Sequence, residues 1–78
     1  MPRVNLGKPP MLLQYEQQLR EDYGKSLTVG NLCDLLNTGD RRTAIAFVSD
    51  LPYVMVGTRK RWMAADVARR MYERTVTP

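Results

Sequence analysis

The basic residues in the second half of the chain gather in short clusters. Arg41 and Arg42 are adjacent, and Arg59, Lys60 and Arg61 form a run of three. The planar guanidinium group of arginine matches phosphate oxygens and the edge of guanine, so these clusters favour an acidic partner, with nucleic acid as the first candidate. A solvated charged surface has the same composition, and charge alone does not separate the two interpretations.

The excess of basic over acidic residues lies in the second half of the chain. Twelve basic and eight acidic residues give a net charge of +4 among 78 residues. Residues 1–39 hold four of each sign, whereas residues 40–78 hold eight basic and four acidic residues. An acidic partner is therefore expected to meet the second half of the chain.

The residue types that most enzymes need are missing from the sequence. It contains no histidine, which removes the usual general base near neutral pH and the commonest metal ligand. Its single cysteine, Cys33, can form neither an internal disulfide nor a thiolate cluster for zinc, and no phosphate-binding GxxxxGK motif is present. We therefore expect no enzymatic activity, no cofactor and no metal, and a reducing cytoplasmic location without a membrane segment.

The length allows one small core. A chain of 78 residues with 44% hydrophobic and 26% charged residues is typical of a single folded domain. Residues 1–9 lack hydrophobic periodicity and are predicted to be a flexible arm. Residues 10–78 are predicted to form the domain.

The elements that must position the two basic clusters begin with an N-terminal helix over residues 10–23. Its apolar residues recur every four positions and are Met11, Tyr15, Leu19 and Tyr23. Gly24 follows them, and glycine is a common helix terminator. The opposite face is polar without a basic excess, so this amphipathic helix is predicted to brace the domain.

A pair of helices with a short turn carries the first basic cluster. Thr28 and Asp40 are suited to cap the free N–H groups at the start of each helix. The second helix of the pair is predicted over residues 41–49. Its buried residues are expected to be Ala44, Phe47 and Val48, and its outward residues Arg41, Arg42, Ile45 and Ser49.

The second basic cluster lies on a predicted β-hairpin. Residues 53–56 and 59–63 are rich in β-branched and aromatic residues and flank the turn Gly57-Thr58. Trp62 is expected in the core, because a lone tryptophan between apolar neighbours is usually the largest piece of a small core. The charged tip of the hairpin is expected to be exposed.

A final helix is predicted after the hairpin. It begins near Ala64, and residues 75–78 are expected to fray beyond its end. Its inward residues are expected to be Val67, Ala68, Met71 and Tyr72, and its outward residues Arg69, Arg70, Glu73 and Arg74. Solvent is the expected environment of these three arginines.

Two helices joined by a turn and followed by a basic hairpin form the outline of a winged helix-turn-helix. From residue 27 to residue 72 the sequence resembles the excisionase family of small winged-helix DNA-binding proteins, whose fold is related to the MerR DNA-binding domain. The matching positions are Leu27-Thr28-Val29, Leu35-Leu36, Arg41-Arg42-Thr43, Leu51-Pro52, Val54, Val56-Gly57, Arg59, Arg61 and Asp66-Val67. The fold class that this implies is mainly α with a small β-hairpin, preceded here by the N-terminal amphipathic helix.

The resemblance implies a recombination directionality factor, an accessory protein that binds and bends attachment-site DNA and recruits a tyrosine-type integrase to favour excision of a mobile element. Related members are transcriptional regulators, which is the alternative within the same class. Cooperative binding of several copies to repeated sites is expected, because one copy of so small a protein buries a modest contact area.

Nine residues are predicted to contact double-stranded DNA. They are Arg41, Arg42, Thr43, Ile45 and Ser49 on the helix in the major groove, and Thr58, Arg59, Lys60 and Arg61 on the hairpin against the backbone or minor groove. This prediction requires both groups to lie on one exposed rim of the molecule. A hypothesis from another class is a protein-interaction adaptor, which exposes the apolar stripe of residues 11–23 and binds an acidic protein through its arginines.

Overall fold

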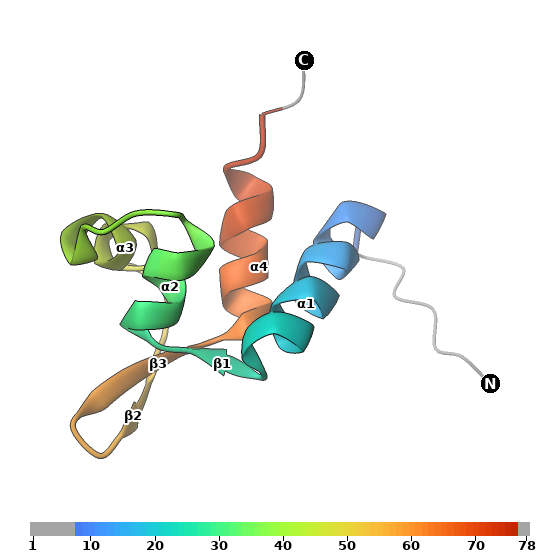
Figure 1. Cartoon of the computed structure of the whole chain (residues 1–78). Helices are drawn as coiled ribbons and strands as arrows, with labels where there is room; N and C mark the ends of the chain where they lie inside the picture. Colours follow the sequence, from blue (N-terminus) through green and yellow to red (C-terminus); the bar gives the residue numbers. More distant parts are fainter. Residues whose placement is uncertain (1–7, 77–78) are drawn as a thin grey trace.

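Four helices and a three-stranded antiparallel sheet make up residues 8–76, the part of the chain that this computed structural model describes (Figure 1). In chain order the elements are α1 (Pro10–Tyr23), β1 (Ser26–Leu27), α2 (Val29–Leu35), α3 (Arg41–Phe47), β2 (Val54–Val56), β3 (Arg59–Met63) and α4 (Ala64–Glu73). The prediction of a mostly helical domain with a β-hairpin is confirmed. Figure 1 shows the helices gathered on one side of the short sheet, with the β2–β3 hairpin extending beyond them.

Helix α1 has the predicted bounds because local signals define both of its ends. Pro10 stands at its first position, where a missing N–H costs nothing, and Gly24 ends it with a φ of 93°. The helix packs against α4 through a buried row formed by Leu12, Glu16 and Leu19. The apolar stripe expected to be an exposed adaptor surface is therefore not one: Leu19 is 1% exposed, and Tyr15 and Tyr23 pack against the core.

A tyrosine at the end of α1 connects it to α2. The Tyr23 hydroxyl donates a hydrogen bond of 2.6 Å to Oδ2 of Asp34. This bond to a carboxylate stabilises the protonated phenol and, with desolvation and the negative charge of Asp34, raises the pKa of Tyr23 to about 12. The brace predicted for α1 thus includes a polar contact to the helix pair.

The sheet contains a strand that the sequence pattern did not predict. Strand β1 pairs with β3, placing Leu27 opposite Trp62 and Ser26 opposite Met63, and the strand order is β1-β3-β2. A strand of two residues has no alternation to detect, and its partner lies more than thirty residues away. Leu27 and Trp62 are both buried, so the core position predicted for Trp62 is confirmed.

The helix pair forms between two side-chain caps. Thr28 Oγ1 accepts from the Asn31 N–H at 3.2 Å, while Asn31 Oδ1 accepts from the Thr28 N–H at 3.1 Å, a reciprocal capping box. Asn37 then turns the chain with a φ of 53°, a conformation that asparagine tolerates well. Asp40 caps α3 by accepting from the Arg42 N–H at 2.9 Å, so both predicted caps are confirmed.

Helix α3 ends at Phe47, two residues before the predicted end at Ser49. Val48 leaves helical geometry with a φ of −122°, and its N–H bonds to the Ile45 carbonyl three residues back at 3.1 Å. The carbonyl of Phe47 is taken instead by the Arg70 side chain. The Arg70 side chain of α4 therefore bonds to a carbonyl that a backbone N–H would otherwise bond if the helix continued.

Three predictions for α4 and the residues after it were wrong. Arg70, expected to face solvent, is 7% exposed, and Tyr72, expected to face inward, is exposed. Arg70 lies three residues after buried Val67, so it shares the inward side of α4, where its long stem can pack. Thr75, expected to fray, donates from Oγ1 to the Met71 carbonyl at 2.7 Å, and this oxygen also lies 3.0 Å from the Tyr15 hydroxyl.

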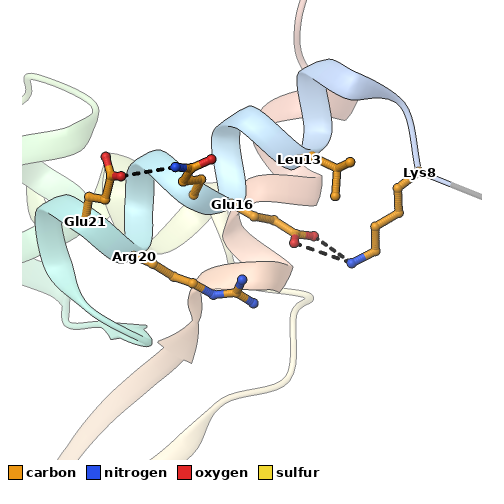
Figure 2. A pocket seen from close by; sticks show the side chains of 6 residues that line it. Lys8, Leu13, Glu16, Arg20 and Glu21 are labelled. Carbon is orange, nitrogen blue, oxygen red and sulfur yellow. Dashed lines mark hydrogen bonds and ion pairs between the residues drawn. The ribbon is translucent and has the colours of Figure 1, made fainter. Parts of the chain in front are cut away.

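The start of the described chain is tied to α1. Lys8 Nζ lies 3.0 Å from Oε1 of Glu16, a carboxylate that is almost fully buried (Figure 2). Residues 1–7 of the predicted arm lie outside the described residues. Between residues 8 and 76, no helix combines the length and the apolar character needed to cross a membrane.

Candidate nucleic-acid interface

Helix α3 presents one exposed strip and a second strip that includes partly buried Phe47, which was predicted to be buried and packs against the core. At 3.6 residues per turn, Arg41 and Ile45 lie one above the other with Arg42 beside them, and we call these three residues the arginine strip. The second strip is formed by Thr43, Ala46 and Phe47 and faces α2 and the end of α4. The residues of the arginine strip are all exposed, as predicted.

The N-terminal cap of α3 places a carboxylate next to the arginine strip. Asp40 accepts the Arg42 N–H through Oδ1 and the Thr43 hydroxyl, at 3.3 Å, through Oδ2. The hydroxyl proton of Thr43 is therefore used within the cap, and its side chain belongs to the second strip. Thr43 was predicted to contact DNA together with the arginines; it is exposed next to Arg42, and its hydroxyl bonds to the cap.

The two arginines at this end have no acidic partner in the part of the chain that the structure describes. Neither Arg41 nor Arg42 has a carboxylate oxygen within 4.0 Å of its guanidinium. Ser49, the fourth predicted outward residue, is exposed just beyond the helix, and its hydroxyl donates to the Ala46 carbonyl at 3.2 Å. The two guanidinium groups are thus available to an external anion.

The run of three cations on the hairpin divides between the two faces of the sheet. Arg59 is paired with Val56, and Arg61 with Val54, so both arginines lie on the face opposite Trp62, which we call the outer face. Lys60 lies on the inner face. Its Nζ sits 4.7 Å from the centre of the Tyr53 ring, a cation–π contact.

Next to the hairpin turn, the two arginines of the outer face differ in exposure and in hydrogen bonding. Gly57 has a φ of 63°, which glycine adopts without strain in a two-residue hairpin turn, and Thr58 beside it is exposed. Arg59 is exposed and has no carboxylate within 4.0 Å among residues 8–76. Arg61 is half-buried, and its Nη1 donates to Ser26 Oγ at 3.4 Å.

Apolar side chains share the hairpin with these arginines. Val54, Met55 and Val56 are 50%, 52% and 55% exposed. They form β2, whose outer edge has no partner strand in the described sheet. The hairpin therefore offers a mixed surface of guanidinium groups and apolar side chains.

The elements that carry the two candidate groups lie on the same side of α4. Figure 1 shows α3 and the β2–β3 hairpin on one side of α4, and α1 on the other. A hollow of about 640 Å³ lies along α1 (Figure 2). Two basic residues, Lys8 and Arg20, and two acidic residues, Glu16 and Glu21, line it, so its charges balance.

Comparisons with family models, with curated proteins and with solved structures give no match to this chain. Within residues 8–76, no group of three or more acidic or cysteine side chains is arranged to hold a metal ion. What the chain can bind therefore has to be inferred from the residues described above.

Arg70 is a residue whose role the sequence pattern missed. Its Nη1 donates to the Phe47 carbonyl at 2.6 Å, its Nη2 to Asp50 Oδ2 at 2.7 Å, and its Nε to Glu73 Oε1 at 3.2 Å. It joins the end of α3 to α4 and so fixes the orientation of the arginine strip. The hydrogen bond from Arg70 also holds the pKa of Asp50 below its ordinary value.

Proposed function

We propose that this protein is a small winged helix-turn-helix protein that binds double-stranded DNA in a sequence-specific manner. The observation that carries the proposal is the set of exposed, unpaired guanidinium groups of Arg41, Arg42 and Arg59 on two elements that lie on the same side of α4. A binding surface for a polyanion needs cations that internal carboxylates have not already neutralised.

The proposed docking follows from the shapes of the two elements. A helix about 10–12 Å across fits the major groove, which is about 12 Å wide. Arg41 and Arg42 then reach base edges and phosphates, while Ile45 can pack on a thymine methyl group. The hairpin lies against the adjacent backbone or minor groove, with Arg59 and Arg61 toward the phosphates and Thr58 at its tip.

The resemblance to excisionases supports a finer assignment. Such a protein promotes excision of a mobile element together with a tyrosine-type integrase, and several copies bind neighbouring sites. Transcriptional regulation of the same element is the alternative within this class. A neighbouring integrase gene favours the first assignment, and its absence favours the second.

One observation favours a second candidate function, a protein-interaction adaptor. The exposed apolar residues of β2 lie along the free edge of the sheet, where an extended segment of another protein can add a strand. This adaptor surface replaces the α1 stripe, in which Leu19 is buried and Tyr15 and Tyr23 pack against the core. An adaptor of this kind would bind its partner with little dependence on salt.

The experiment that tests the DNA proposal is a mobility-shift titration on duplex DNA from the protein's own locus, with excess unrelated duplex as competitor. The paired variant Arg41→Ala/Arg42→Ala should lose binding to the preferred site. The matched control, Arg20→Ala/Lys25→Ala, removes the same charge from two exposed residues outside the proposed surface and should bind like the parent. Equal losses in the two variants, or no shift in the parent, would reject the proposed interface.

A further inference from the structure

The second strip of α3 borders a hollow that the proposed DNA contact does not use. The hollow has a volume of about 460 Å³, within the roughly 300–1,000 Å³ that ligand pockets occupy. It lies between the end of α2, one flank of α3 and the residue that follows α4, and it is lined by Leu36, Thr43, Ala46, Phe47 and Arg74. Three of the five lining residues are apolar.

The charge at this hollow is positive and comes from Arg74. The Arg74 guanidinium lies 5.8 Å from the centre of the Phe47 ring, and within residues 8–76 it has no carboxylate oxygen within 4.0 Å. Asp50 and Glu73 both form ion pairs with Arg70. An incoming carboxylate therefore meets a guanidinium that forms no ion pair with an acid of the described chain.

The apolar residues Leu36 and Phe47, which we call the floor, and the guanidinium of Arg74 together indicate which kind of ligand fits the hollow. A nucleic-acid backbone brings phosphates but no apolar group for Leu36 and Phe47, so the floor would stay exposed. A free anion has the same shortcoming. A peptide with alternating acidic and large apolar residues satisfies both, because its apolar side chain covers the floor while its carboxylate reaches Arg74.

We propose that this hollow is a docking site for an acidic, apolar segment of a partner protein. The hollow is lined by Thr43, Ala46 and Phe47 of α3 and by no residue of the arginine strip, so a partner can bind while the strip holds another ligand. The inference does not depend on the DNA proposal, since no residue of the arginine strip or the hairpin lines the hollow.

The test is an NMR titration of the isotope-labelled protein with a short synthetic peptide, acetyl-Asp-Phe-Glu-Leu-Asp-amide, in the absence of DNA. Binding should shift the amide signals around Leu36, Phe47 and Arg74 while leaving the hairpin signals in place. Two control peptides dissect the recognition: one carries Lys in place of the acidic residues, and the other carries Ser in place of Phe and Leu. Neither control should bind.

Two variants test the assignment to this hollow. Arg74→Ala should weaken peptide binding by about tenfold, the effect of losing one hydrogen bond to a charged group. Ala46 is exposed, and the substitution Ala46→Glu places a larger, negatively charged side chain in the hollow, so it should abolish binding. The control substitution Gln14→Glu on α1 adds the same charge elsewhere and should not change binding. The inference is overturned if the peptide shifts nothing, if the Lys peptide binds equally well, or if duplex DNA shifts the same signals in its place.

Discussion

Two sets of arginines in this protein have the same chemistry and opposite surroundings. Arg70 is buried, and each of its three side-chain nitrogens donates to an oxygen at the junction of α3 and α4. Arg41, Arg42 and Arg59 are exposed and lack a carboxylate partner among residues 8–76. The first arrangement stabilises the fold, and the second is free to bind an anion.

The comparison shows that the partners of a cation, and not its neighbours in sequence, decide its role. Arg69-Arg70 and Arg41-Arg42 are both pairs of adjacent arginines that the sequence predicts to face outward from a helix. Arg70 follows buried Val67 by three residues and meets acceptors at the end of α3 and just after it. The guanidinium groups of Arg41 and Arg42 have no carboxylate oxygen within 4.0 Å among residues 8–76. Substitutions should therefore separate stability from binding.

The largest expected effect is on stability, at Arg70. Arg70→Met should lower the free energy of unfolding by about 3 kcal/mol, because the Phe47 carbonyl loses its partner and α3 loses its link to α4. The neighbouring control, Arg69→Met, should stay within about 0.5 kcal/mol of the parent. Urea unfolding followed by circular dichroism measures both. If Arg70→Met itself does not fold, Arg70→Lys should fold with a smaller loss; equal stability of all four proteins would refute the structural role of Arg70.

The second effect is on DNA affinity, at the arginine strip. Arg41→Ala or Arg42→Ala should cost about 1–3 kcal/mol on the preferred site if the side chain contacts a base edge, and much less on random duplex. Unfolding should be unchanged, in contrast to Arg70→Met. Anisotropy titrations give the affinity of each variant for the two DNAs. An arginine whose loss weakens binding equally on both DNAs contacts phosphate only.

Local sequence signals predicted much of the fold. The bounds of α1 follow from Pro10 and Gly24, and the helix pair follows from the caps Thr28 and Asp40. Each of these signals acts within a few residues of the element it defines. The alternation that predicts the hairpin is equally local.

The features that the sequence pattern missed depend on distant partners. Strand β1 exists because Leu27 meets Trp62, and the burial of Arg70 depends on acceptors at Phe47 and Asp50. Glu16 interrupts an apolar row, and its burial depends on Lys8. In the candidate interface, the exposure of the arginines was predictable from helix geometry, and the division of the hairpin cations between two faces was predictable from strand alternation. The hydrogen bond from Arg61 to Ser26 was not, because it depends on β1.

A third, smaller effect concerns the carboxylate beside the arginine strip. Asp40→Ala should destabilise the protein by about 1 kcal/mol through loss of the α3 cap, whereas Asp40→Asn keeps the cap and removes the charge. Asp40→Asn should therefore raise DNA affinity, by up to about fivefold at low salt, without a change in stability. Thermal unfolding and binding titrations test this pair of variants. Weaker DNA binding by Asp40→Asn would place the carboxylate in a favourable contact with the ligand.

The smallest expected effect is the pH dependence contributed by Asp50. Its pKa is lowered in the folded state by the Arg70 hydrogen bond, so its contribution to stability is present above the unfolded pKa of about 3.9 and is lost as the pH falls through the lower folded pKa. Asp50→Asn should be less stable than the parent at neutral pH, and the difference should shrink in acid. Asp22→Asn, which removes an exposed carboxylate without an ion pair in the described chain, is the control. A difference that stays constant with pH would exclude the ion pair as its source.

The salt dependence of duplex binding tests the role of the free arginines most directly. The logarithm of the binding constant should fall linearly with the logarithm of salt concentration, by about 0.9 for each phosphate neutralised. Arg59→Ala should make that slope less steep by about 0.9, and Arg20→Ala on α1 should leave it unchanged. A slope near zero for the parent, or equal changes in the two variants, would contradict a DNA-binding surface built from α3 and the hairpin.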